Sequence, residues 1–299
     1  PISGAGKEWD YQSFQWLRDA ENVFEKVRES WKKSTEKTVS NQFVSIAGIL
    51  KYIDTYETEQ KFYSKLGSDI VDKLDHSAKD NELNARQKKK AMKWDSIKNI
   101  DLSDSNGGNS FLRALHGTYT DMPPRRADDY KLMKIIRKDK TNAGKIAKLD
   151  KKFNYVFVDK NKKPISMTIW QYKEGPKRAW AKKNKNYGQY DTGIPVSLGV
   201  KLQKYIVEEK LNSGDFLFGI ETNHQKPYSS SGYSSLVSKN LFKTFTGFPV
   251  DINMLRHAYA SWYLPEMKTM RQQEELAFQM GSSVMELHKT YFKIELTKN

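Results

Sequence analysis

The sequence has no cysteine and no long run of apolar residues. Without cysteine the chain has no disulfide, no cysteine-ligated zinc or iron–sulfur site and no thiol catalysis. No window approaches the roughly 18 consecutive apolar residues of a membrane span, and no basic-then-apolar signal segment opens the chain. We therefore expect an intracellular protein that is not secreted and has no membrane partner, with chemistry carried by oxygen and nitrogen groups.

Histidine is also scarce, and the familiar motifs of hydrolases and nucleotide-binding proteins are missing. The five histidines show no paired spacing on one helix face with an acidic partner, as a metal site would need. No glycine-rich loop matches a phosphate cradle, and G-x-S-x-G is absent. We expect no metal, no cofactor and no small-molecule substrate.

The apolar content shows that the chain folds. Hydrophobic residues make up 37% and aromatic residues 12% of the 299 residues, which is too much for a disordered polymer. At about 150 residues per domain, the length predicts two domains.

Positive charge is abundant and concentrated. The net charge is +15, and residues 131–190 alone hold 18 basic and 4 acidic side chains. A basic surface that covers a duplex must extend over many phosphates, so a bias sustained over this length favours nucleic acid as the partner.

Residues 1–100 read as a helical domain. Apolar residues recur near helical spacing over 9–31 and 43–53, and two more helices are expected near 61–74 and 82–97. The stretch DLSDSNGGN, residues 101–109, has the composition of a linker. We place the domain boundary there, with a second domain over 110–299.

The second domain is expected to be mainly α with a small antiparallel β-sheet. Helices are predicted near 111–119 and 127–136, and helical signal returns from Ser197 onward. Between them, β-rich runs occur at residues 154–159, 165–172 and 187–196, and the connection before the last run is rich in lysine.

Three segments in this domain resemble the three helical boxes of the tyrosine recombinase/integrase family, in the family's order. They are MPPRRADDYKLMKI (Met122–Ile135), NMLRHAYASWYL (Asn253–Leu264) and MGSSVMELHKTYFK (Met280–Lys293). The likeness covers about residues 110–293. It is similar in particular to members found in large DNA viruses, virophages and related self-synthesising transposons.

The resemblance implies a set of catalytic residues. The first arginine would be Arg125, supported by Asp128, or in the alternative register Arg126 with Asp129. The second arginine would be Arg256, followed by His257, and the nucleophile would be Tyr291. The lysine of the hairpin would be Lys173, with Lys183 and Lys185 as alternatives.

These residue types suit metal-free phosphodiester chemistry. A phenol with a pKa near 10 is a weak nucleophile at neutral pH, so it needs cationic neighbours. Two arginines can hold the non-bridging phosphate oxygens with fixed, always-charged forks, and a lysine can protonate the departing 5′ oxygen.

Two positions depart from the family pattern. Asn253 stands where the family usually has His or Lys, and Ser282 where it usually has His or Trp. Neither is a good proton carrier, and acid–base help is worth about 10²–10⁴ in rate. Slow or conditional catalysis is therefore expected, unless His257 or His288 compensates.

The resemblance implies a site-specific DNA recombinase with a 3′-phosphotyrosyl intermediate and no nucleotide cofactor. It also implies a helical core-binding domain and an α/β catalytic domain forming a C-shaped clamp on double-stranded DNA, with self-association to a dimer or tetramer, and a location at DNA in nucleus, cytoplasm or viral factory. Alternatives are DNA relaxation of the type IB topoisomerase kind and a catalytically impaired DNA-binding protein on the same scaffold. The basic residues expected to contact DNA are Arg86, Lys88, Lys89, Lys90, Lys93, Lys177, Arg178 and Lys182.

Overall fold

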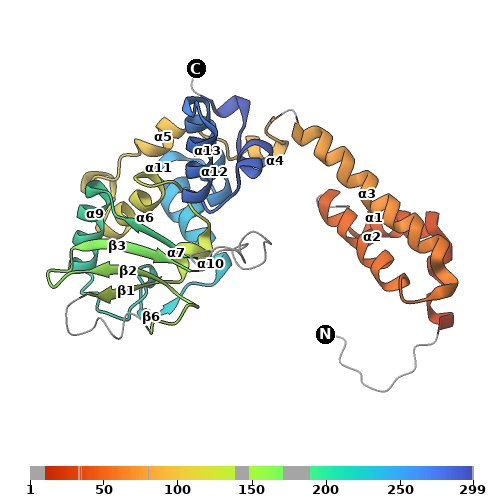
Figure 1. The fold of residues 1–299 in the computed structure, drawn as a ribbon, viewed down its shortest axis with the longest axis horizontal. Helices are drawn as coiled ribbons and strands as arrows, with labels where there is room; N and C mark the ends of the chain where they lie inside the picture. Colours follow the sequence, from red (N-terminus) through yellow and green to blue (C-terminus); the bar gives the residue numbers. More distant parts are fainter. Residues whose placement is uncertain are drawn as a thin grey trace. The chain divides into compact units, whose positions relative to one another are not determined.

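The computed structural model describes residues 11–32, 34, 36–79, 81–138, 148–170 and 189–297. The chain divides into two compact units, Pro1–Asp80 and Asn81–Asn299 (Figure 1). Each unit has its own hydrophobic core. The chain is mainly helical with a small mixed sheet.

The first unit is all-helical, as the sequence predicts. Its core combines aliphatic and aromatic side chains. The Phe43 ring stacks on Tyr63 at 6.3 Å and on Phe24 at 5.7 Å between centroids. The buried Tyr63 hydroxyl donates to the Leu17 carbonyl at 2.7 Å, which satisfies its polar end. The elements are η1 (Tyr11–Arg18), α1 (Ala20–Ser30), α2 (Glu36–Leu50), η2 (Asp54–Tyr56) and α3 (Glu57–Lys79).

Four helices of the second unit, α4, α6, α12 and α13, begin at a polar cap. Asn84, Asn109, Asp251 and Thr269 each accept a hydrogen bond from the first turn that follows, which satisfies one of the amides left free at a helix start. The α-helices are α4 (Ala85–Lys88), α5 (Trp94–Lys98), α6 (Ser110–Thr120), α7 (Ala127–Lys131), α9 (Val196–Glu208), α10 (Ser230–Ser235), α11 (Thr244–Thr246), α12 (Ile252–Tyr263), α13 (Met270–Gln279) and α14 (Val284–Glu286). The 3₁₀ turns are η3 (Asp104–Asn106), η6 (Leu264–Glu266) and η8 (Ile294–Leu296), and the π-helical turns are η5 (Leu236–Lys243) and η7 (Leu287–Tyr291).

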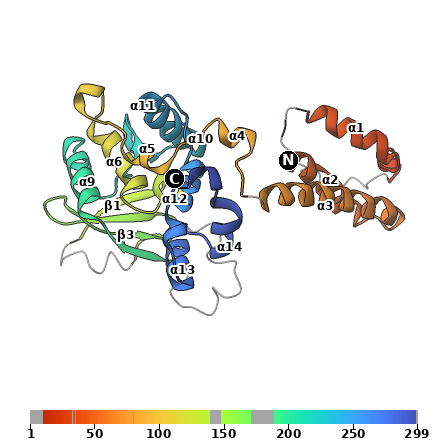
Figure 2. The same ribbon diagram turned by 90° about the horizontal axis from the view of Figure 1, so that it is seen from above.

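A four-stranded sheet lies in the second unit. Its order is β1 (Met133–Arg137), β2 (Asn154–Val158), β3 (Pro164–Ile169) and β4 (Tyr190–Gly193). All five residues of β2 are buried, as expected for a central strand. Helices α6 and α9 pack on each other and α9 contacts β3 (Figures 1 and 2). A separate pair is formed by β5 (Gly219–Ile220) and β6 (Asn223–Pro227).

The sheet is mixed, whereas the sequence predicts an antiparallel one. Strands β2, β3 and β4 pair antiparallel, but β1 pairs parallel to β2. The predicted helix over 127–136 ends at Lys131, and its second half is β1. The other edge of β1 is also paired: the Ile135 amide donates to Asp215 O at 2.9 Å and the Leu217 amide to Met133 O at 2.7 Å. Pairing on both edges with distant segments overrides the local helical pattern.

Along the chain, the boundary between the compact units lies between Asp80 and Asn81. The sequence predicts this boundary in the stretch 101–109. Trp94, Ile97 and Leu102 are buried in the core of the second unit, and the Trp94 ring packs edge-on against Tyr259 at 4.9 Å. The Arg113 side chain donates a hydrogen bond to Leu102 O at 2.9 Å, which fixes the stretch 101–109 against α6. The turn-forming residues there belong to a fixed loop of the second unit.

Candidate active site

A cavity of about 930 Å³ lies in the second unit, beside several of the residues that the sequence predicts for the site. The N-terminal end of α12, the end of η7, and parts of α4, α7 and α10 line it. Three cations face it, Arg86, Lys90 and Arg126, together with hydroxyl groups from α10 and the tyrosine segment. Three carboxylates, those of Asp128, Asp251 and Glu286, also line the cavity, so its lining carries charges of both signs. The cations and hydroxyl groups are the donors there that could bind a phosphate.

Tyr291 stands at the wall of this cavity, at the end of η7. It is 6% exposed. Its ring lies over the guanidinium of Arg256, with 4.4 Å from Cζ to the ring centroid, and its backbone carbonyl accepts from His257 Nδ1 at 3.1 Å. The predicted nucleophile and second arginine are therefore brought into contact.

Arg256 is completely buried on α12. Its Nη1 donates to two backbone carbonyls, Pro124 O at 2.9 Å and Met280 O at 2.6 Å. Its Nε and Nη2 have no hydrogen-bond partner among the described residues. Burial lowers the pKa of Arg256, and the Tyr291 side chain opposes this effect. A buried cation with two unused donors lacks an acceptor, and a phosphate oxygen is the acceptor that suits a guanidinium best.

The neighbouring residues Arg125 and Arg126 have different surroundings. Arg125 is fully buried, pairs with Asp129 at 2.9 Å, and has its Cζ 4.5 Å from the Tyr190 ring centroid. Arg126 is half-buried and lines the cavity. The sequence favoured Arg125 as the first arginine and kept Arg126 as the alternative register. Of the two, Arg126 is the one that lines the cavity.

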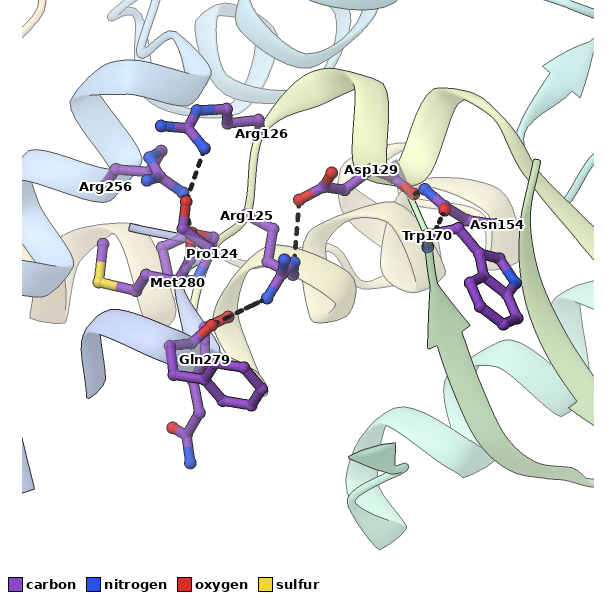
Figure 3. Close-up of polar contacts among 11 residues, drawn as sticks. Pro124, Arg125, Arg126, Asp129, Asn154, Trp170, Arg256, Gln279 and Met280 are labelled. Carbon is purple, nitrogen blue, oxygen red and sulfur yellow. Dashed lines mark hydrogen bonds and ion pairs between the residues drawn. The ribbon is translucent and has the colours of Figure 1, made fainter. Parts of the chain in front are cut away.

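Three arginines converge on the C-terminal end of α13 (Figure 3). Arg125 donates to Gln279 O at 2.6 Å, Arg256 to Met280 O at 2.6 Å and Arg126 to Gly281 O at 2.6 Å. The last carbonyls of a helix have no partner within it and carry partial negative charge, so cations stabilise this end. This contact joins the three sequence boxes, because α13 leads into the tyrosine segment.

Asp128 does not pair with Arg125 in the described contacts, contrary to the expected supporting role. It is two-thirds exposed and forms an ion pair with Lys131 at 2.8 Å, while Asp129 is the acidic partner of Arg125. Asp129 is buried, and its backbone carbonyl also accepts from Asn154 at 2.7 Å. The acidic partner of Arg125 is therefore Asp129, four positions along the chain, and not the expected Asp128 at three positions.

Asn253 lines the cavity on the first turn of α12. Asp251 caps this helix by accepting from the Met254 amide at 2.9 Å, and it also binds Lys90 at 2.7 Å. The first residues of α12 line the cavity, so the positive end of the helix dipole lies at the cavity wall. The Asn253 side chain supplies a neutral amide donor at the position where the family pattern has His or Lys.

His257 is a buried, neutral side chain. Burial lowers its pKa to about 4, partly opposed by its hydrogen bond to the Tyr291 carbonyl. A carbonyl can only accept, so Nδ1 carries the proton and Nε2 accepts from Gln87 Nε2 at 3.1 Å. Both ring nitrogens are thus engaged in hydrogen bonds. His257 lines the cavity but is not placed to act as a proton carrier there.

The remaining auxiliaries lie away from the cavity wall. The Ser282 hydroxyl is buried and has no partner among the described residues, and Ser282 does not line the cavity. His288 is exposed and bonds Gln273 at 3.0 Å. Neither replaces the missing histidines in this structure.

Of the basic residues expected to contact DNA, Arg86 and Lys90 line the cavity, Lys88 lies 3.9 Å from Glu295, and Lys89 and Lys93 are exposed. The other candidates fall outside the described residues: Lys173, Lys177, Arg178, Lys182, Lys183 and Lys185.

Sequence reasoning missed Gln87 and the hydroxyl residues of the cavity. Gln87 closes a capping box with Asn84, and the N-x-x-Q spacing was the available signal. The serine-rich run that begins at Ser229 supplies Ser234, Ser235 and Ser238 to the cavity wall. A run of serines reads as a turn from sequence alone, so this role was not evident.

In the part of the chain that the structure describes, no cluster of three or more histidines and carboxylates has the arrangement of a metal site. None of the helices in that part has the length and apolar character of a membrane span.

No protein-family model matches the sequence, and no curated protein matches it. Among solved structures, the chain is similar to one titled "Crystal structure of XerA recombinase", with 11% sequence identity and a TM-score of 0.41. The match covers 93% of this chain and 86% of that chain.

Proposed function

We propose that this chain breaks and rejoins DNA through a covalent tyrosine intermediate, as a site-specific recombinase does. The observation that supports this most directly is the packing of Tyr291 over the buried Arg256, at the wall of a cavity whose lining includes Arg86, Lys90 and Arg126. The two unused donors of Arg256 would bind the phosphodiester that Tyr291 attacks.

In the proposed step, the Tyr291 oxygen attacks phosphorus and the bond from phosphorus to the 5′ oxygen breaks. The phenol loses its proton to solvent or a base, and the departing 5′ oxygen takes up a proton, which we assign to Lys173, Lys183 or Lys185. The product is a 3′-phosphotyrosyl bond and a free 5′ hydroxyl. Attack by a 5′ hydroxyl reverses the step, so no metal or nucleotide is consumed.

The arginines have separate roles in this proposal. Arg256 and Arg126 stabilise the charge that develops on the non-bridging oxygens, because one lies against Tyr291 and the other lines the cavity. Arg125 is a supporting residue, because Asp129 and the end of α13 already occupy it. Arg86 and Lys90 bind the neighbouring DNA backbone.

A covalent-adduct assay tests the proposal. The protein is incubated with duplexes carrying a 5′-bridging phosphorothiolate, whose sulfur leaves without an acid, and adducts are separated on a denaturing gel. We expect an adduct with the natural chain and none with Tyr291→Phe. Binding without any adduct would refute catalysis. Relaxation of supercoiled DNA at arbitrary sequence would favour a topoisomerase over a recombinase.

One observation favours a second candidate, a DNA-binding protein that has lost its chemistry. Asn253 and Ser282 replace the usual histidines, and His257 is engaged with the Tyr291 backbone. If the phosphorothiolate gives no adduct although the protein binds duplex with steep salt dependence, this candidate stands. Replacing Asn253 and Ser282 with histidine would then be expected to restore cleavage.

A further inference from the structure

A chain of hydrogen bonds links the first helix of the second unit to the backbone of the tyrosine. The Gln87 side chain donates to His257 Nε2 at 3.1 Å, and His257 Nδ1 donates to Tyr291 O at 3.1 Å. Gln87 and His257 are 170 residues apart in sequence. All three residues line the same cavity.

The Gln87 side chain is held in one orientation by its own helix. Its Oε1 accepts from the Asn84 amide at 2.9 Å, and the Asn84 side chain accepts from the Gln87 amide at 2.9 Å, so the capping box of α4 is complete. With Oε1 occupied by an amide, only the NH₂ group can face His257. The donor and acceptor of every bond in the chain are therefore defined.

The same segment holds the residues that follow Tyr291. The Ile294 amide donates to Asn81 O at 3.1 Å, and the Glu295 carboxylate accepts from the Leu83 amide at 3.0 Å. Lys88 lies 3.9 Å from the same carboxylate. Residues 81–88 thus contact both the Tyr291 carbonyl, through His257, and the chain immediately beyond it.

We propose that Gln87 is a positioning residue for Tyr291 and acts through His257. This inference rests on the proposed function of Tyr291 as the nucleophile. Gln87 keeps the neutral imidazole in the Nδ1–H form, and that form holds the Tyr291 carbonyl, so the ring stays over Arg256. Because residue 81 follows directly on the first unit, the segment that positions the tyrosine is also the one through which the two units are joined.

The charged groups around His257 agree with a neutral ring. Burial, Lys293 and Arg256 all lower the pKa of His257. Asp251 raises this pKa, but its effect is smaller than that of burial. Replacing Gln87 with glutamate would change this balance. A carboxylate accepts and cannot donate, so it would stabilise His257 as a cation that still donates through Nδ1. Glutamate also suits the capping-box position, so α4 should be retained.

The first test measures the position of Tyr291 without DNA. Ring signals of ¹³C-labelled tyrosine are recorded by NMR, with Tyr291 assigned from Tyr291→Phe. Gln87→Met should shift and broaden the Tyr291 signals. The control is Gln203→Met on α9, which removes the hydrogen bond from the Gln203 side chain to Asn161 O and should leave the Tyr291 signals unchanged. Unchanged Tyr291 signals in Gln87→Met would overturn the inference, whether or not the protein cleaves DNA.

The second test measures the single-turnover rate of adduct formation. Gln87→Met should slow it by roughly tenfold or more at unchanged DNA affinity, since misplacement by about 1 Å can cost up to 100-fold. Gln87→Glu should react near the natural rate at pH 6 and more slowly at pH 9, where His257 loses its proton and faces a carboxylate. A pH profile parallel to that of the natural chain would count against Gln87. If the natural chain itself gives no adduct, the proposed function fails and the NMR result alone decides the positioning role.

Discussion

At the scale of single residues, Arg125 and Arg256 are both fully buried guanidinium groups with opposite surroundings. Arg125 has a carboxylate partner, Asp129. Arg256 has no carboxylate partner among the described ion pairs: its Nη1 donates to backbone carbonyls, and its guanidinium lies against the Tyr291 ring. An incompletely paired buried charge is costly to the folded state. A group kept at that cost is expected to serve binding or chemistry more than stability.

Substituting each arginine with methionine should therefore separate stability from activity. Arg256→Met is expected to lower the adduct rate by about 10²–10³, as loss of an oxyanion donor does, with a small change in Tm. Arg125→Met leaves Asp129 buried without its cation and should destabilise the protein by about 3–5 kcal/mol. Thermal melts and single-turnover rates of the two variants check this. Equal loss of stability in both would contradict the distinction.

The buried His257 predicts a loss of stability in acid. Its pKa in the folded protein is about 4, below the ordinary value of 6.5. Between these values the unfolded chain binds the proton and the folded chain does not, so the contribution is intact above pH 6.5 and falls as the pH drops toward 4. At 1.36 kcal/mol per pKa unit the full effect is roughly 3 kcal/mol.

Urea unfolding at pH 7 and pH 4.5 measures this effect. The difference between the two pH values should shrink in His257→Gln and persist in His288→Gln, because His288 is exposed. An undiminished difference in His257→Gln would assign the acid sensitivity to other groups, such as the buried His116, whose pKa is also lowered by burial.

At the scale of elements, the end of α13 is where the three boxes meet. Gly281 follows this helix with φ +63°, a left-handed conformation that favours glycine, and its carbonyl accepts from Arg126. Exchanging Gly281 for alanine strains the backbone at the point where a cavity arginine binds.

Gly281→Ala should lose about 1–2 kcal/mol of stability and also slow adduct formation. Gly247→Ala is the matched control, because Gly247 has φ +78° and open space around an added Cβ but does not line the cavity. It should show a similar stability loss at an unchanged rate. Parallel rate losses in both variants would indicate a general effect of strain.

At the scale of the whole molecule, the second unit should fold by itself only if it includes residues 81–109. Trp94, Ile97 and Leu102 lie in its core, and burying such side chains is worth about 1.5–3 kcal/mol each. A chain starting at Asn81 is expected to melt cooperatively, whereas one starting at Ser110 is not. Circular dichroism melts check this. Equal stability of the chains that start at Asn81 and at Ser110 would support the domain boundary at residues 101–109 that the composition predicts.

The sequence by itself determined the local features of this protein. Apolar spacing predicted the helices of residues 11–79, and β-branched and aromatic runs predicted the strands at 154–158 and 164–169, because these signals lie within one element. The residue types also limited the chemistry to arginine, lysine and tyrosine. In the structure, Arg256 and Tyr291 lie in contact, as the box pattern implied.

Only the tertiary structure decided features that depend on distant partners. Whether Arg125 or Arg126 reaches the cavity follows from where Asp129 and the end of α13 lie. The parallel pairing of β1 depends on β2 and on residues 214–217. The neutral state of His257 depends on its burial, and the hydrogen-bond partner of its Nε2 is the distant Gln87. Such contacts join residues up to 170 positions apart, and no local pattern encodes which of many chemically equivalent partners will be the neighbour in the folded chain.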